Sequence, residues 1–219
     1  MKFFTKVGGV GHENIMTILQ NSYTTPEVHA DSSVLIEKFD LIDIYSNHLR
    51  KKICRALNAG NKPLTGMHII VDAGNGAGGF FATKVLDELG ADITGSQFLE
   101  PDGHFPNHMP NPEDKKAMAS IKKAVLDNKA DLGLIFDTDV DRMSAVLDNG
   151  EDISRNALIA MMAAILAPDY PHSTIVTDSV TSDELTNFLE KNLRLHHVRY
   201  MRGYRNVINK CIELNLAGI

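Results

Sequence analysis

The feature that most constrains the fold is an alternation of short apolar runs with longer amphipathic segments. Residues 67–73 (MHIIVDA) and 131–137 (DLGLIFD) are nearly continuous apolar runs, which is typical of strands buried on both faces of a sheet. The segments between these two runs are predicted as a helix, a strand and a second helix at residues 78–90, 91–99 and 112–129. This order implies right-handed crossovers and a largely parallel sheet with helices on its faces.

The same alternation continues along the chain. Residues 40–57 have helical spacing, and residues 142–148 alternate as a strand that runs back from the second apolar run. After Gly150 we expect a helix, strand, helix, strand and helix at residues 154–167, 173–178, 181–191, 195–201 and 204–214. The predicted fold class is therefore α/β, with two consecutive three-layer α/β units whose sheets are mixed and mainly parallel, the second being incomplete.

The first part of the chain has little pattern. Residues 1–30 contain three closely spaced glycines and a polar stretch, so we interpret them as the end of a preceding domain followed by a linker. Residues 31–150 are predicted to form a complete domain, and residues 151–219 part of the next one.

Composition excludes several classes of partner. The chain has a formal net charge of -6 and contains no Lys- or Arg-rich block, which argues against nucleic acid as a partner. The longest apolar run, residues 157–167, is too short to span a bilayer. The N-terminus lacks the apolar segment of a signal peptide, and the only cysteines, Cys54 and Cys211, form no CxxC motif. We therefore expect a soluble cytoplasmic protein with reduced thiols.

A glycine-rich turn follows the first apolar run. In DAGNGAGGFF, the residues Gly74, Gly76 and Gly79 have GxGxxG spacing, and Glu100 follows at about the distance at which dinucleotide-binding proteins place a ribose-binding acid. One interpretation is that a cofactor pyrophosphate binds at the start of the helix. The other is a tight strand-to-helix turn in which glycines permit positive φ and close packing.

Three observations favour the tight turn over an NAD site. Asp72 would repel an anionic phosphate at this position, Asn75 and Gly78 are typical of a turn selected for its shape, and Glu100 lies in a Pro/Gly loop instead of closing a strand. We therefore assign no cofactor to the glycines.

An acidic triplet follows the second apolar run. Asp137, Asp139 and Asp141 occupy alternate positions at the carboxyl end of a predicted strand, the edge at which open α/β sheets bind ligands. Three carboxylates so close together repel one another unless a cation neutralises them. Their hard oxygen ligands suit Mg²⁺, which readily shares a phosphate oxygen with its protein ligands. The alternative is a solvated acidic turn between two strands.

Other metal-loop types fit this segment less well. An EF-hand beginning at Asp137 would require glycine and glutamate where the chain has Arg142 and Asp148. A phosphatase of the haloacid dehalogenase type would use Asp137 as its nucleophile. That motif has Thr or Val at the position of Asp141 and continues into a helix, whereas a returning strand is predicted here.

The segment FDTDVDR resembles the metal loop of the α-D-phosphohexomutases. The segments DAGNGAGG, PDGHFPNHMPNPED and RGYRNVI are also similar to segments of that family and occur in the same order. MKFFTK and DLIDIYSNHL resemble the end of its first domain and the start of its second, so the resemblance covers nearly the whole chain. It implies that residues 1–30, 31–150 and 151–219 are the end of domain 1 with a linker, domain 2, and part of domain 3.

The resemblance also implies a mechanism. Four domains surround one cleft and supply a phosphoserine, a Mg²⁺ loop, a sugar-recognition loop and a phosphate-binding loop, and the enzyme interconverts hexose 1- and 6-phosphates through a bisphosphate. By this resemblance Asp137, Asp139 and Asp141 would ligate Mg²⁺, and Arg142 would lie beside the transferring phosphate. The alternative for Arg142 is an ion pair with one of its own aspartates.

The chain departs from the family pattern in two respects. Thr138 and Val140 replace glycines or small residues of the metal loop. There is no Thr-Ala-Ser-His-Asn-Pro-like seryl loop, and the sugar loop and fourth domain would lie beyond Ile219. We therefore expect no turnover by this chain alone, and the identity of the hexose stays open. A non-catalytic module that binds Mg²⁺ or a sugar phosphate is an alternative.

Several further residues are weaker candidates. His104 and His108 lie in a polar loop without a carboxylate partner at a recognisable spacing, which favours a packing or interdomain role. His196 and His197 lie in a predicted strand and are expected to be structural. Residues 202–204 either face a ligand or form the start of a helix.

Overall fold

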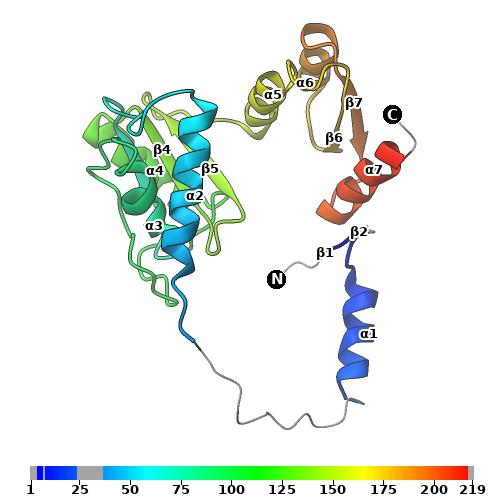
Figure 1. The fold of residues 1–219 in the computed structure, drawn as a ribbon, viewed down its shortest axis with the longest axis horizontal. Coiled ribbons are helices and arrows are strands. Elements are labelled where there is room, and N and C mark those ends of the chain that lie inside the picture. The colour runs from blue at the N-terminus through cyan, green and yellow to red at the C-terminus, as the bar shows by residue number, and fades with distance from the viewer. Residues whose placement is uncertain (1–3, 7, 24–36, 217–219) are drawn as a thin grey trace. The chain divides into compact units, whose positions relative to one another are not determined.

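The chain contains two compact units in the computed structural model, which describes residues 4–6, 8–23 and 37–216 (Figure 1). Unit 2 is continuous in sequence and comprises residues 36–153. Unit 1 combines the residues before this range with those after it. Each unit is described by itself below.

A three-stranded mixed sheet forms the centre of unit 2. Its strands are β3 (Ile69–Asp72), β4 (Leu132–Phe136) and β5 (Met143–Leu147), in the order β3-β4-β5. Strand β3 is parallel to β4, whereas β5 returns antiparallel to β4, with Phe136 opposite Met143. The predicted α/β class with mixed sheets is confirmed, and so is the returning strand.

Helices α2 (Leu41–Ala56) and α4 (Lys115–Asn128) both begin at an aspartate. The Asp40 carboxylate accepts a hydrogen bond from the backbone N–H of Ile42 (3.0 Å). The Asp114 carboxylate accepts from the N–H groups of residues 116 and 117. These caps satisfy backbone donors that have no partner inside the helix, and the Asp114 cap explains why α4 starts later than the predicted residue 112.

The helix predicted at residues 78–90 is irregular. A short α3 (Gly79–Phe81) leads into the π-helical segment η1 (Ala82–Leu86), where the N–H of Asp87 bonds to the carbonyl of Ala82 (3.0 Å). The wider π turn changes hydrogen-bond spacing without changing the apolar pattern, so the sequence does not reveal it.

The prediction of a strand at residues 91–99 is wrong. This segment pairs with residues 68–72 at only two isolated bridges, His68 with Asp92 and Asp72 with Gln97. Between these points the Asp92 carboxylate accepts from the N–H of Thr94 (2.9 Å), and Gly95 has a φ of +86°. This local turn interrupts the pairing that a continuous strand would require.

The core of unit 2 lies on both faces of its sheet, which gives the predicted three layers. On the α4 face the fully buried residues include Ile70, Ile121, Val125 and Ile135. On the other face Ile69, Val71 and Phe136 pack with residues of η1, including Ala82 and Leu86. Successive residues of β3 therefore face opposite helices, which explains why Ile69, Ile70 and Val71 are all apolar.

Unit 1 contains a second parallel pair of strands, β6 (Thr174–Asp178) and β7 (His196–Tyr200). Its core includes Ala163, Leu185, Leu189 and Leu195. The helical elements of this part are α5 (Arg155–Leu166), α6 (Asp183–Asn187), η2 (Phe188–Asn192) and α7 (Tyr204–Leu216). They follow the predicted order, with η2 adding a second π-helical segment.

The N-terminal residues of unit 1 contain structure that the sequence did not indicate. Strands β1 (Phe4–Thr5) and β2 (Gly8–Gly9) form an antiparallel pair, followed by helix α1 (His12–Ser22). The N–H of Gly9 donates to Oδ1 of Asn209 on α7 (3.2 Å). Helix α1 has no buried residue, although its apolar residues Ile15, Met16, Ile18 and Leu19 have helical spacing. The rest of the predicted linker, and the predicted boundary at residue 31, lie outside the described residues.

Among the described residues, no helix is both long and apolar enough to cross a membrane.

Candidate metal and phosphate site

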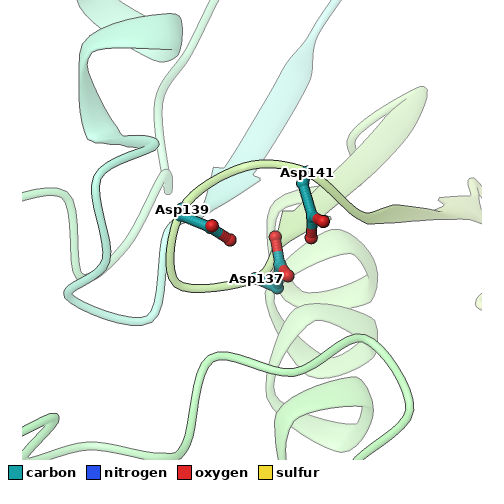
Figure 2. A group of neighbouring side chains, drawn as sticks. All are labelled: Asp137, Asp139 and Asp141. Carbon is teal, nitrogen blue, oxygen red and sulfur yellow. The ribbon is translucent and has the colours of Figure 1, made fainter. Parts of the chain in front are cut away.

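The three aspartates predicted as metal ligands converge in the loop between β4 and β5 (Figure 2). One carboxylate oxygen from each of Asp137, Asp139 and Asp141 lies within 4.8 Å of the others. Asp137 is buried at the end of β4, whereas Asp139 and Asp141 are exposed. The loop therefore presents one buried and two accessible carboxylates to the same point.

The backbone of this loop, the metal loop hereafter (residues 137–142), is curled by its own hydrogen bonds. The N–H of Asp137 donates to the carbonyl of Arg142 (3.1 Å), and the N–H of Val140 donates to the carbonyl of Asp137 (3.3 Å). Val140 has a φ of +63°, a region in which a β-branched residue is strained. Its side chain packs on the apolar cluster that includes Phe136, and this burial offsets part of the strain.

Arg142 is held by the aspartates of its own loop. Its Nε donates to Oδ2 of Asp137 (2.9 Å), its backbone N–H donates to Oδ1 of Asp137 (3.0 Å), and Nε lies 3.5 Å from Oδ1 of Asp141. The hydrogen bond with Asp137 is the main reason that the pKa of Arg142 is raised above its ordinary value. The ion pair considered as an alternative for Arg142 is thus present, and half of the side chain is still exposed.

The donor set of the metal loop fits a hard divalent cation. Three carboxylates and one guanidinium leave the loop with an excess of two negative charges. Each carboxylate oxygen has two lone pairs, so the two hydrogen bonds from Arg142 do not exhaust the acceptor capacity of Asp137. An all-oxygen set of this charge suits Mg²⁺.

The glycine-rich turn packs directly against the metal loop. The N–H of Ala77 donates to the carbonyl of Thr138 (2.9 Å). A Cβ added at Gly76 would lie 3.0 Å from that carbonyl oxygen, and one at Gly79 would lie 1.8 Å from the carbonyl oxygen of Leu99. Close approach of backbones therefore accounts for these glycines, as the tight-turn interpretation proposed.

A cavity of about 600 Å³ opens beside this turn. Its lining includes residues 75–77, 79 and 80 of the turn, Thr138 of the metal loop, and residues 99–103 and 105 of the following loop. Thr138, which lies between Asp137 and Asp139, therefore borders a hollow large enough for a small ligand.

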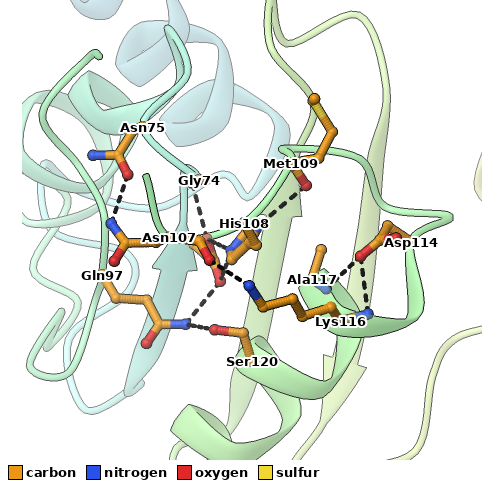
Figure 3. A network of polar contacts seen from close by, with 11 residues as sticks. Gly74, Asn75, Gln97, Asn107, His108, Met109, Asp114, Lys116, Ala117 and Ser120 are labelled. Carbon is orange, nitrogen blue, oxygen red and sulfur yellow. Dashed lines mark hydrogen bonds and ion pairs between the residues drawn. The ribbon is translucent and has the colours of Figure 1, made fainter. Parts of the chain in front are cut away.

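His104 and His108, which were predicted to lack a carboxylate partner, each have one. Nδ1 of the exposed His104 lies 2.9 Å from Oδ1 of Asp102. Nε2 of His108 lies 3.0 Å from both oxygens of Asp72, and both side chains are buried (Figure 3). A signal for the second pair was available, because an aspartate that ends a fully buried strand requires a hydrogen-bonding partner.

The remaining weaker candidates lie in unit 1. Both ring nitrogens of His197 contact threonine hydroxyls, those of Thr177 and Thr186, at 2.8 Å, and burial lowers the pKa of His197. These contacts fit the structural role expected for it. Residues 202–204 lead into α7 and line a cavity of about 760 Å³, so both interpretations proposed for them are compatible with their position.

Comparisons with known proteins agree with the resemblance found in the sequence. Residues 43–150 match the family model described as phosphoglucomutase/phosphomannomutase, alpha/beta/alpha domain II. A phosphomannomutase/phosphoglucomutase of Pseudomonas putida is 29% identical over 183 residues, which cover 84% of this chain and 37% of the relative. A probable phosphoglucosamine mutase of Methanosarcina barkeri is 40% identical over 95 residues, covering 43% and 21%.

Solved structures show the same fold. A phosphoglucomutase/phosphomannomutase family protein from Burkholderia thailandensis superposes with a TM-score of 0.67 at 24% identity and covers 83% of this chain and 37% of its own. A putative phosphomannomutase from Thermus thermophilus gives a TM-score of 0.64 at 19% identity, covering 96% and 46%.

Fold and sequence together define an α/β domain of the phosphoglucomutase/phosphomannomutase type. The chain belongs to the α-D-phosphohexomutase family. It spans about a third of the length of the phosphomannomutase/phosphoglucomutase and phosphoglucomutase relatives, and less of the phosphoglucosamine mutase.

Proposed function

We propose that this chain is the metal-binding part of a phosphohexomutase, which interconverts hexose 1-phosphate and hexose 6-phosphate through a phosphoserine and a bisphosphate. The observation that carries the proposal is the convergence of Asp137, Asp139 and Asp141 to within 4.8 Å beside Arg142. A structural relative, N-acetylphosphoglucosamine mutase of Aspergillus fumigatus, is described in complex with GlcNAc-6P and magnesium (TM-score 0.51, 18% identity), which supports this choice of ligands.

In this proposal the three aspartates hold Mg²⁺, and the bound ion would neutralise charge on the transferring phosphoryl group. Arg142 contributes a second positive group. Its backbone N–H and its Nε–H both donate to Asp137, which holds the guanidinium against the metal loop, and the guanidinium is a planar donor suited to phosphate oxygens. In this proposal the residues of this chain position the transferring phosphoryl group and neutralise its charge, whereas the nucleophilic serine is supplied by another part of the enzyme.

The assignment of domains is part of the proposal. Residues 1–30 are the end of domain 1 and a linker, residues 31–150 are domain 2 with the metal loop, and residues 151–219 are part of domain 3. The hexose phosphate would therefore bind together with the missing domains, and we expect no turnover by these 219 residues alone. A cytoplasmic location stays a prediction.

Mg²⁺ titration tests the metal site directly. Calorimetry with the wild-type chain should show binding, and Asp139→Asn should weaken it by at least about tenfold, as the loss of a metal-site partner commonly does. Asp148→Asn is a matched control, because Asp148 is an exposed aspartate just beyond β5. Equal affinity in wild type and Asp139→Asn would contradict the proposal.

The native protein tests the reaction. An intact mass well above 24.1 kDa would identify a longer enzyme, to be assayed with hexose 1-phosphate and a hexose bisphosphate; activity that is lost in Asp139→Asn is expected. A native mass of 24.1 kDa, or no activity in the longer chain, would favour the non-catalytic module. A dehalogenase-type phosphatase with Asp137 as nucleophile is disfavoured, since strand β5 follows the loop where that motif requires a helix.

A further inference from the structure

The buried pair of Asp72 and His108 is not accounted for by the proposed metal site. The Asp72 carboxylate, which is fully buried, accepts hydrogen bonds from the N–H of Gly74 (2.9 Å) and from Nε2 of Gln97 (2.7 Å) as well as meeting His108. Nδ1 of His108 lies 3.1 Å from the carbonyl oxygen of Met109. Every polar atom of both side chains therefore has a partner in the network of Figure 3.

Stability alone is a weak reason for this arrangement. Removing a carboxylate from water is costly, and apolar residues of similar size often serve a protein core equally well. What a fully hydrogen-bonded polar pair adds is a defined position for the segments that it joins. Here it joins the end of β3 to a loop more than thirty residues later, at His108.

The segment joined to β3 sits against the glycine-rich turn. Gly74 has a φ of +53°, and a Cβ there would lie 2.9 Å from Cε1 of His108 and 2.7 Å from Cβ of Pro110. The imidazole thus fills the space above Gly74 while Asp72 holds its N–H. Together these contacts fix the start of the turn.

The other end of the turn touches the metal loop. Ala77 donates its N–H to the carbonyl of Thr138, and Gly76 packs on the backbone of the same residue. Thr138 lies between two of the proposed ligands, Asp137 and Asp139. A displacement of the turn is therefore passed to the backbone that carries both carboxylates.

A second set of hydrogen bonds, exposed to solvent, also joins the loop around His108 to the glycine-rich turn. Nδ2 of Asn107 donates to Oδ1 of Asn75 (2.8 Å), whose own Nδ2 donates to the carbonyl of Glu100 (2.9 Å). Nζ of Lys116, in the first turn of α4, donates to the carbonyl of Asn107 (2.9 Å). The loop is thus tied to the turn on both sides of Gly74.

We infer that His108, through Asp72 and the glycine-rich turn, is a positioning residue for the metal loop. The inference rests on the proposed function in that the loop is taken to hold Mg²⁺. It assigns a role to a histidine that lies outside the ligand set and touches no proposed ligand.

Mg²⁺ affinity, measured by calorimetry on the whole chain, is the first readout. His108→Leu should weaken binding about tenfold, the lower end of the effect of substituting a residue that supports a metal ligand. His108→Gln keeps a donor for Asp72 and should restore most of the affinity. The matched control is His68→Leu, because His68 precedes β3 at the opposite end of this strand from Asp72 and its Nε2 lies 2.7 Å from the carbonyl oxygen of Thr94. The His68→Leu variant should have a lower midpoint of thermal unfolding and an unchanged Mg²⁺ affinity.

Amide hydrogen exchange without metal is the second readout. The N–H groups of Asp137, Val140 and Arg142 are each hydrogen-bonded within the metal loop and should exchange several-fold faster in His108→Leu but not in His68→Leu. Unchanged affinity and exchange in His108→Leu, or equal effects in His68→Leu, would overturn the inference. If the wild type fails to bind Mg²⁺, the proposed metal site is refuted and exchange alone decides whether His108 positions the loop.

If His108→Leu does not fold, the exposed hydrogen bond between Asn107 and Asn75 can be tested instead. Asn107→Ala removes the bond to Asn75 from the surface and should accelerate the same three amides, with a smaller loss of affinity than His108→Leu would give. A variant indistinguishable from wild type in both readouts would then overturn the inference.

Discussion

Replacing Gly76 with alanine tests how closely the glycine-rich turn supports the metal loop. The new Cβ would lie 3.0 Å from the carbonyl oxygen of Thr138, 3.1 Å from its Cα and 3.1 Å from the carbonyl oxygen of Ala73. Ordinary van der Waals contact for such atoms begins at 3.4 Å. All three are backbone atoms, so no side-chain rotation can relieve the overlap, and the two segments must separate by a few tenths of an ångström.

The size of the effect follows from two opposing contributions. Overpacking in a well-packed region costs about 1–3 kcal/mol, and overlaps this small correspond to the lower part of that range. Alanine also restricts the unfolded chain, which favours the folded state by about 0.4–1 kcal/mol. We therefore expect a net loss of about 1 kcal/mol in the free energy of unfolding, together with weaker Mg²⁺ binding because Thr138 is displaced.

Urea unfolding and Mg²⁺ calorimetry measure the two consequences on one sample. Gly103→Ala is the matched control, because a Cβ at Gly103 meets no atom within 4 Å. It should leave Mg²⁺ affinity unchanged and stability unchanged or slightly raised. If Gly76→Ala keeps wild-type stability and wild-type Mg²⁺ affinity, the close packing does not support the loop and the reasoning is refuted.

Three further outcomes are expected. Ile121→Ala removes a fully buried side chain from the α4 face of the sheet and should lower the free energy of unfolding by about 2–5 kcal/mol in urea titrations; a loss below 1 kcal/mol would contradict the assignment of this core. Because burial lowers the pKa of His197, the unfolded chain takes up the proton at higher pH than the folded chain. Its contribution to stability is therefore complete above the ordinary histidine pKa of about 6.5 and is lost as the pH falls from there through the lowered folded value. Thermal unfolding at several pH values should show this loss in wild type but not in His197→Gln. Finally, NAD(H) at millimolar concentration should not shift the midpoint of thermal unfolding, and a clear shift would revive the dinucleotide interpretation of the glycine-rich turn.

Much of the architecture was predictable because burial leaves a pattern in the sequence. Strands β3 and β4 are apolar at successive positions since helices cover both faces of their sheet. Helix α4 shows helical spacing because only one of its sides faces the core. The alternate spacing of the three aspartates at a strand end likewise indicated that they converge. The left-handed conformation of Val140, which helps to curl the loop, could not be predicted from the sequence. Tertiary packing imposes this conformation although a β-branched residue disfavours it.

What could not be predicted depends on contacts between distant segments or on local turns. The positive φ of Gly95 and the hydrogen bond from the N–H of Thr94 to the Asp92 carboxylate interrupt residues 91–99. The apolar pattern of this segment is nevertheless that of a strand. The partner of Asp72 is separated from it by a whole helix and loop, and no spacing rule connects the two. Helix α1 does carry apolar residues at helical spacing, Ile15, Met16, Ile18 and Leu19, but the segment is short and lies next to a glycine-rich and a polar stretch, so the prediction of an unstructured end was wrong there.

The interrupted sequence of unit 1 has a consequence for the order of folding. Its first residues meet helix α7 through Gly9 and Asn209, which are 200 residues apart, and unit 2 occupies most of the chain between them. During translation, residues 36–153 emerge completely before α7 is made, so unit 2 can collapse first. Its collapse removes more than half of the flexible length that must be closed, and each halving lowers the entropic cost of closure by about 0.6 kcal/mol. The order of synthesis therefore lets unit 2, which is continuous in sequence, fold first and shorten the loop that must close when unit 1 forms.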